Sequence, residues 1–110
     1  MQHLERAGSL EGEHVGTGEI GSLDDGTVVR IQVKRDGDRI VEARFKVFGC
    51  SAAIASASLV TEWLEGAAID EAQRVTAERV VQQLALAPER EHVAAMAVQA
   101  GVKAVEAAKP

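Results

Sequence analysis

Residues 48–66 read FGCSAAIASASLVTEWLEG, and this stretch decides the fold. A run of alternating apolar residues ends at Gly49, and the only cysteine of the chain, Cys50, follows it. Small and apolar residues then recur at spacings of three and four as far as Gly66, a residue type that commonly ends helices. The pattern predicts a helix that Ser51 caps and that lies on a sheet formed by the preceding residues.

Two antiparallel strands are predicted before this helix. Val29, Ile31 and Val33 alternate with polar residues, which is the pattern of a strand with one buried face. The sequence Asp-Gly-Asp at 36–38 supplies the residues of a tight hairpin turn. The apolar residues of the second strand share one face: Val41, Ala43, Phe45 and Val47. The two strands are therefore expected to form a hairpin with one apolar face.

The first part of the chain is less regular. Residues 1–22 are rich in Gly, Glu and Ser, and they predict a partly ordered N-terminal arm with a short strand near residues 15–20. Residues 23–27, LDDGT, predict a turn, because Asp and Gly tolerate the backbone angles that turns need. Residues 23–110 are then expected to form a single domain.

Further helices are predicted in the second half. We expect a short turn of helix at 69–74, a second short helix at 76–84 and a long helix at 87–107. The long helix places His92 in its first turn, beside an apolar stripe formed by Val93, Ala97, Ala100 and Ala104. Strands followed by helices indicate an α+β fold, in which helices pack on one face of a small antiparallel sheet.

Length and composition restrict the function classes. A chain of 110 residues corresponds to one domain, and a single cysteine excludes an intrachain disulfide. The formal net charge is −5 and the basic residues are scattered, so we expect no nucleic-acid partner. No stretch approaches the ~20 apolar residues that span a bilayer, and the N-terminus does not resemble a signal peptide. We therefore expect a cytoplasmic protein with no membrane partner.

Three residues are candidates for chemistry. Cys50 lies between a strand end and a helix start, a position that favours the metal-binding thiolate, although a lone cysteine is more often a small buried side chain. His92 is expected to be neutral near its helix start, the form that binds metals, although a lone histidine is more often a surface residue. Asp25 is a turn residue by default and an oxygen ligand in its functional interpretation. Residues 16–21, GTGEIG, match GxGxxG but do not link a strand to a long helix, so no dinucleotide site is predicted.

The stretch that decides the fold also resembles a known family. Phe48-Gly49-Cys50 is followed by AIASASLVTEW at 53–63, then by Gly66 and IDEA at 69–72. This pattern is similar to that of the IscU/NifU N-terminal family, whose members are iron–sulfur cluster assembly scaffolds. The resemblance extends over about residues 8–108. It implies the same α+β fold and a role in iron–sulfur cluster assembly.

The resemblance also shows where this chain departs from the family. The family site uses three cysteines, a nearby aspartate and a histidine. In this sequence the second cysteine is Cys50 and the histidine is His92. The first and third cysteine positions hold Asp25 and Val93, and the aspartate position holds Thr27. The chaperone-docking sequence Leu-Pro-Pro-Val-Lys is changed to LAPER, so chaperone-driven transfer is not expected.

The retained residues lead to three hypotheses, none of which makes the chain an enzyme. In the first, Asp25, Cys50 and His92 hold iron, zinc or a labile [2Fe–2S] cluster, completed by a second subunit in a homodimer or by a partner. In the second, the chain keeps the fold but holds no cluster, and docks on a cysteine desulfurase, another assembly protein or a metalloenzyme. In the third, which we rank last, Cys50 carries sulfur as a persulfide.

Overall fold

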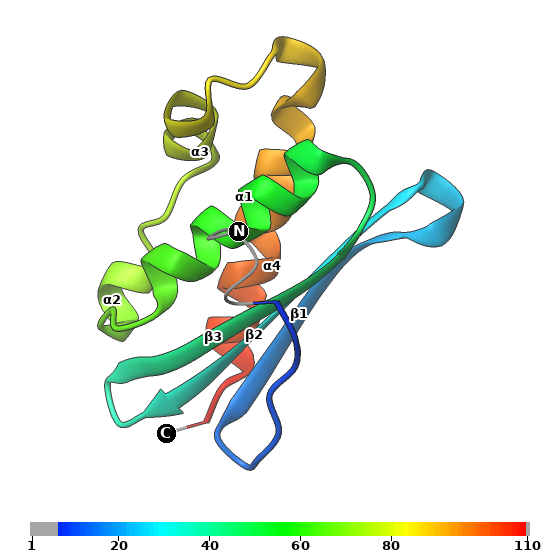
Figure 1. Cartoon of the computed structure of the whole chain (residues 1–110). Helices are drawn as coiled ribbons and strands as arrows, with labels where there is room; N and C mark the ends of the chain where they lie inside the picture. Colours follow the sequence, from blue (N-terminus) through cyan, green and yellow to red (C-terminus); the bar gives the residue numbers. More distant parts are fainter. Residues whose placement is uncertain (1–6, 110) are drawn as a thin grey trace.

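The computed structural model describes residues 7–109 and has an α+β architecture, as the sequence predicts. A three-stranded antiparallel sheet in the order β1-β2-β3 is covered on one face by helices α1 and α4 (Figure 1). The strands are β1 (Val15–Ser22), β2 (Thr27–Asp36) and β3 (Arg39–Phe48). The helices are η2 (Leu23–Asp25), α1 (Ser51–Leu64), α2 (Ile69–Ala72), α3 (Ala77–Leu84), η3 (Pro88–Arg90) and α4 (Glu91–Ala107).

Strand β1 forms one edge of the sheet and begins within the segment predicted as an arm. It pairs with β2 from Val15 opposite Lys34 to Ser22 opposite Thr27, so the short strand expected near residues 15–20 is present and slightly longer. The first part of the predicted arm, residues 1–6, lies outside the described residues. The turn expected at residues 23–27 is present as η2.

Two glycines of β1 let helix α4 lie directly on the strand. A Cβ atom added to Gly18 would lie 1.9 Å from the carbonyl oxygen of Ala100. One added to Gly16 would lie 2.0 Å from the carbonyl oxygen of Ala104. The GxGxxG match at residues 16–21 therefore has a packing role, because any side chain at these two glycines would push strand and helix apart.

The core lies between the sheet and helices α1 and α4. Val29, Ile31 and Val33 of β2 are fully buried, as their alternation predicts. The predicted stripe of α4 is confirmed, because each of its residues is fully buried: Val93, Ala97, Ala100 and Ala104. Helix α3 packs against both α1 and α4.

The prediction for Val41 is wrong, because strand β3 contains a bulge. Lys34 pairs with Glu42, but the next residue of β2, Arg35, pairs with Ile40, so Val41 has no partner across the ladder. An extra residue in one strand reverses the alternation beyond it. As a result Ile40 is fully buried, whereas Val41 is 41% exposed.

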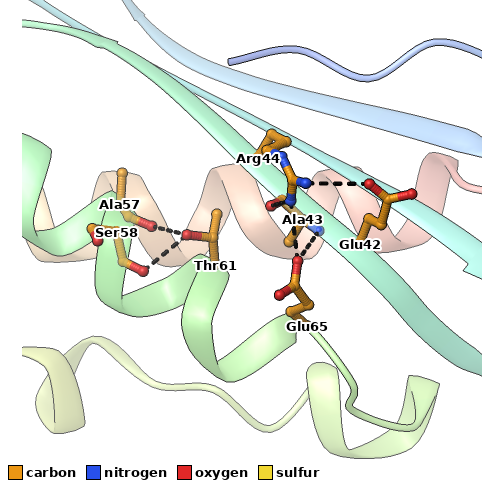
Figure 2. A network of polar contacts seen from close by, with 7 residues as sticks. All are labelled: Glu42, Ala43, Arg44, Ala57, Ser58, Thr61 and Glu65. Atoms are coloured by element: carbon orange, nitrogen blue, oxygen red, sulfur yellow. Dashed lines mark hydrogen bonds and ion pairs between the residues drawn. The ribbon is translucent and has the colours of Figure 1, made fainter. Parts of the chain in front are cut away.

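Side-chain and backbone hydrogen bonds connect the end of helix α1 to β3. Figure 2 shows that the Glu65 carboxylate accepts from the backbone N–H of Ala43 and from the Arg44 guanidinium, with Oε2 at 3.1 Å from each nitrogen. Beyond the helix, the N–H of Gly66 donates to the Ile40 carbonyl over 2.7 Å, and the Ile40 N–H donates to Ala67 over 2.9 Å. The edge of β3 beside α1 is therefore occupied by polar contacts.

The other face of the sheet is partly covered by the residues before β1. The backbone N–H of Leu10 donates to the Gln32 side chain over 3.0 Å, and that side chain donates to the Thr17 hydroxyl over 3.0 Å. The N–H of Gly8 donates to the carbonyl of Phe45 over 3.0 Å. These contacts explain why Gln32 is only 6% exposed although it points away from the helices. Within residues 7–109, no helix has both the length and the apolar character needed to cross a membrane.

Candidate functional site

Cys50 lies where β3 passes into α1, at the end of the sheet that also carries the η2 turn (Figure 1). Its backbone is extended, with φ −79° and ψ 166°, and its carbonyl accepts hydrogen bonds from the N–H groups of Ala53 and Ile54. Cys50 is therefore the N-cap residue, and the prediction of Ser51 as N-cap is wrong because Ser51 already belongs to the helix. The thiol is half-buried and unoxidised.

The surroundings of Cys50 favour its thiolate. The pKa of the thiol is lowered from its ordinary value, first by the backbone N–H of Ala53 and further by the Ala52 N–H and the Arg90 guanidinium. Partial burial acts in the opposite direction, but it does not cancel these effects. The first N–H groups of a helix have no partner within the helix and carry partial positive charge, which explains the sign.

The residue before Cys50 needs to be glycine. Gly49 has φ 151°, a backbone conformation that other residues rarely adopt. A Cβ atom there would also lie 3.1 Å from Cγ2 and 3.2 Å from the hydroxyl of Thr27. Thr27, which the family resemblance matches to the aspartate position, therefore lies beside the chain segment that presents the thiol.

Asp25 is engaged within its own turn. Its carboxylate accepts a hydrogen bond from the Ser22 hydroxyl over 2.9 Å, and its backbone N–H donates to the same hydroxyl over 3.3 Å. Gly26 follows with φ 83° and closes the turn. These contacts are those of a turn residue, and the carboxylate remains exposed at the end of the sheet.

His92 is exposed in the first turn of α4. It lines a hollow of about 470 Å³ between α3 and α4, together with Val81 and Glu78. The next residue, Val93, points the other way and is fully buried. Val93, which the family resemblance matches to the third cysteine position, is therefore part of the core of this protein.

The three predicted ligands are not gathered into one metal site. Among the described residues, no three His, Cys, Asp or Glu side chains form a group that could hold a metal ion. As the described residues lie, they therefore do not supply the three donors of a mononuclear site made by Asp25, Cys50 and His92. The sequence interpretation also missed Arg90, which comes close to Cys50 only in the folded chain.

Comparison with known proteins decides the family. The model of the family described as "NifU-like N terminal domain" matches residues 1–109. The chain belongs to the NifU-like N-terminal domain family. It is 43% identical over 89 residues to the "Iron-sulfur cluster assembly scaffold protein IscU" of Escherichia coli K12, covering 80% of this chain and 70% of that protein. It is 41% identical over 106 residues to the "Iron-sulfur cluster assembly enzyme IscU" of Drosophila melanogaster, covering 91% and 69%.

Solved structures of NifU-like proteins share the fold. The "Putative iron-sulfur cluster assembly scaffold protein for SUF system" from Fervidobacterium islandicum AW-1 aligns with a TM-score of 0.72 at 22% identity, over 93% of this chain and 88% of that one. The N-terminal part of a nitrogen-fixing NifU-like protein from Brucella abortus aligns with a TM-score of 0.55 at 25% identity, over 94% and 72%. The first of these similarities supports the fold alone.

Proposed function

We propose that this chain is a scaffold-like protein of iron–sulfur cluster assembly that receives iron or a labile [2Fe–2S] cluster at Cys50. Membership of the NifU-like family and the names of its relatives support the assembly role. The single observation that carries the site is the position of Cys50, where helix N–H groups and Arg90 favour a thiolate. A thiolate is the form of cysteine that binds iron. The cluster is cargo here, so the chain is not expected to act as an enzyme.

One chain does not supply enough ligands for such a cluster. Clusters of this kind usually take four ligands, most of them thiolates, and Cys50 is the only cysteine. A second copy of the chain would add only one more thiolate, so the remaining ligands come from thiolates outside the two chains, such as those of a cysteine desulfurase in the cytoplasm. A mononuclear iron or zinc site at Asp25, Cys50 and His92 would require these side chains to come closer together than they are in the described part of the chain.

A second candidate function is favoured by a specific observation. Val93 is fully buried at one cysteine position, and the carboxylate of Asp25 is bonded within its turn at another. A chain of this kind can serve as an accessory subunit that keeps the scaffold fold and docks on an assembly protein or a metalloenzyme without holding a cluster.

The deciding experiment measures iron, zinc and acid-labile sulfide on protein purified without oxygen and after reconstitution, together with a visible spectrum. The scaffold role predicts about one [2Fe–2S] cluster per two chains, lost in Cys50→Ser, with a dimer that forms only when the cluster is present. Asp25→Ala and His92→Ala should keep the cluster. Metal at about one ion per chain that all three variants remove would instead indicate the mononuclear site. No metal in correctly folded wild-type protein would leave the accessory role.

A further inference from the structure

A hollow of about 570 Å³ lies on the sheet face that points away from α1 and α4. Two cross-strand rows of side chains line it. In one row Val28 lies opposite Gly21 of β1 and Phe48 of β3, and in the other Arg30 lies opposite Glu19 and Lys46. The hollow is therefore part of a regular sheet surface at the end that carries Cys50.

The first row gives the hollow an apolar wall. Phe48 is 60% exposed, and Leu23 of η2, which also lines the hollow, is 69% exposed. Val28, which also lines the hollow, is half-buried. Only Val41 is a further large apolar residue with comparable exposure among residues 7–109. Exposed apolar side chains that gather in this way typically mark an interaction surface.

The second row gives the hollow a positive rim. Arg30 and Lys46 lie opposite each other, and neither forms an ion pair with any described residue. Glu19 lies on the far side of Arg30, so the positive charge is greatest towards β3. The chain as a whole has a net charge of −5, and this rim is therefore opposite in sign to the average surface. A ligand that matches it must carry negative charge.

The rest of this face is already covered by the chain itself. The segment from Gly8 to His14 crosses the sheet and is bonded to Gln32 and to the backbone of Arg35. These contacts lie two and more residues along β2 from Arg30, and no described residue extends over the hollow. One part of this face is therefore covered by a segment of the chain itself, whereas the hollow remains open.

We propose that this hollow binds an acidic peptide segment of a partner protein. One large apolar side chain of the segment enters the space between Phe48 and Leu23, and a carboxylate beside it pairs with Lys46 and Arg30. Because Phe48 is two residues from Cys50, the bound partner lies next to the thiol. The proposal does not depend on metal or cluster binding.

The test uses the full chain and a fluorescein-labelled peptide, Ser-Glu-Leu-Glu-Phe-Asp-Ser, followed by fluorescence anisotropy and by NMR of the ¹⁵N-labelled protein. We expect saturable binding with chemical-shift changes at residues 19–30 and 46–48. Phe48→Ser and Lys46→Glu should each weaken binding by about tenfold or more. The matched controls are Val41→Ser, an exposed apolar residue elsewhere on β3, and Lys103→Glu, an exposed lysine of α4; both should leave binding within about twofold.

Several outcomes would overturn the proposal. One is binding that neither Phe48→Ser nor Lys46→Glu weakens in folded protein. Another is equal binding of a peptide with Lys in place of each acidic residue, or no binding at millimolar peptide. Binding to vesicles of anionic phospholipid without binding to the peptide would assign the hollow to a membrane surface. If Phe48→Ser changed the sedimentation coefficient but not peptide binding, the hollow would be assigned to contacts between copies of this chain.

Discussion

Replacement of Gly18 by alanine tests the contact between β1 and α4. The added Cβ atom would lie 1.9 Å from the Ala100 carbonyl oxygen and 2.8 Å from the Ala104 nitrogen, both of them backbone atoms. Real Cβ atoms essentially never approach closer than 3.0 Å. Strand and helix must therefore separate by about 1 Å, and no flexible side chain is available to move instead.

The expected cost follows from that displacement. Overpacking of a core costs about 1–3 kcal/mol, and a clash between two backbones belongs at the upper end. We expect Gly18→Ala to lower the free energy of unfolding by about 3 kcal/mol and the melting temperature by roughly 12 °C, at about 4 °C per kcal/mol. Urea and thermal unfolding followed by circular dichroism measure both quantities.

Gly26→Ala is the matched control for Gly18→Ala. Gly26 has φ 83°, and a Cβ atom there meets nothing within 4 Å, so only backbone strain of about 1 kcal/mol is added. A loss of stability in Gly18→Ala no larger than that in Gly26→Ala would refute the close approach of α4 to β1.

Three further predictions concern single side chains. Arg90→Ala should raise the pKa of the Cys50 thiol, because the nearby cation helps to lower it; the pH midpoint of iodoacetamide alkylation then moves upward and the reaction at about pH 7 slows. Glu65→Ala should cost about 1–3 kcal/mol in urea unfolding, because the N–H of Ala43 loses its acceptor. Val93→Cys should cost about 1 kcal/mol and should raise neither iron content nor alkylation, because the new thiol is buried.

Each of these three variants has a matched control variant. Arg90→Lys should keep the alkylation midpoint low, and an unchanged midpoint in Arg90→Ala would contradict the role of that cation. Glu42→Gln removes only the more exposed ion pair of Arg44 and should cost less than Glu65→Ala. Gln99→Cys places a thiol on the exposed side of α4 and should be alkylated at once. A higher iron content in Val93→Cys than in the wild type would show that the start of α4 opens.

The regular parts of the fold could be predicted because they follow one period. The alternation of β2 and the spacing of the α4 stripe are direct consequences of strand and helix geometry. Val41 could not be placed, because its position depends on the bulge opposite Lys34 and Arg35, and nothing in the strand itself marks the change of register. The full length of β1 could not be predicted either, because its glycines weaken the strand pattern. The close approach of α4 to β1 requires these glycines.

The candidate site was less accessible to sequence reasoning. Cys50 was found because it is unique and lies at a boundary between elements. The grouping of Asp25, Cys50 and His92 came from the family resemblance, which gives positions in the sequence only. The direction of a side chain depends on which face of its helix is buried. Val93 occupies the buried face of α4, and its neighbour His92 is therefore turned towards α3. Arg90 was missed because a contact between η3 and the start of α1 is a tertiary feature.

The direction of α4 has a practical consequence for binding measurements. Arg90, the residue directly before α4, lies beside Cys50. The 17 residues of α4, at 1.5 Å each, give the helix a length of about 25 Å. Lys109 follows it, and its carbonyl lies 3.3 Å from Nδ1 of His14, at the start of β1. A linker attached to the last residues therefore leaves from the opposite end of the molecule. A sensor surface that holds the protein by that linker would present the thiol and the hollow at Phe48 freely to solution.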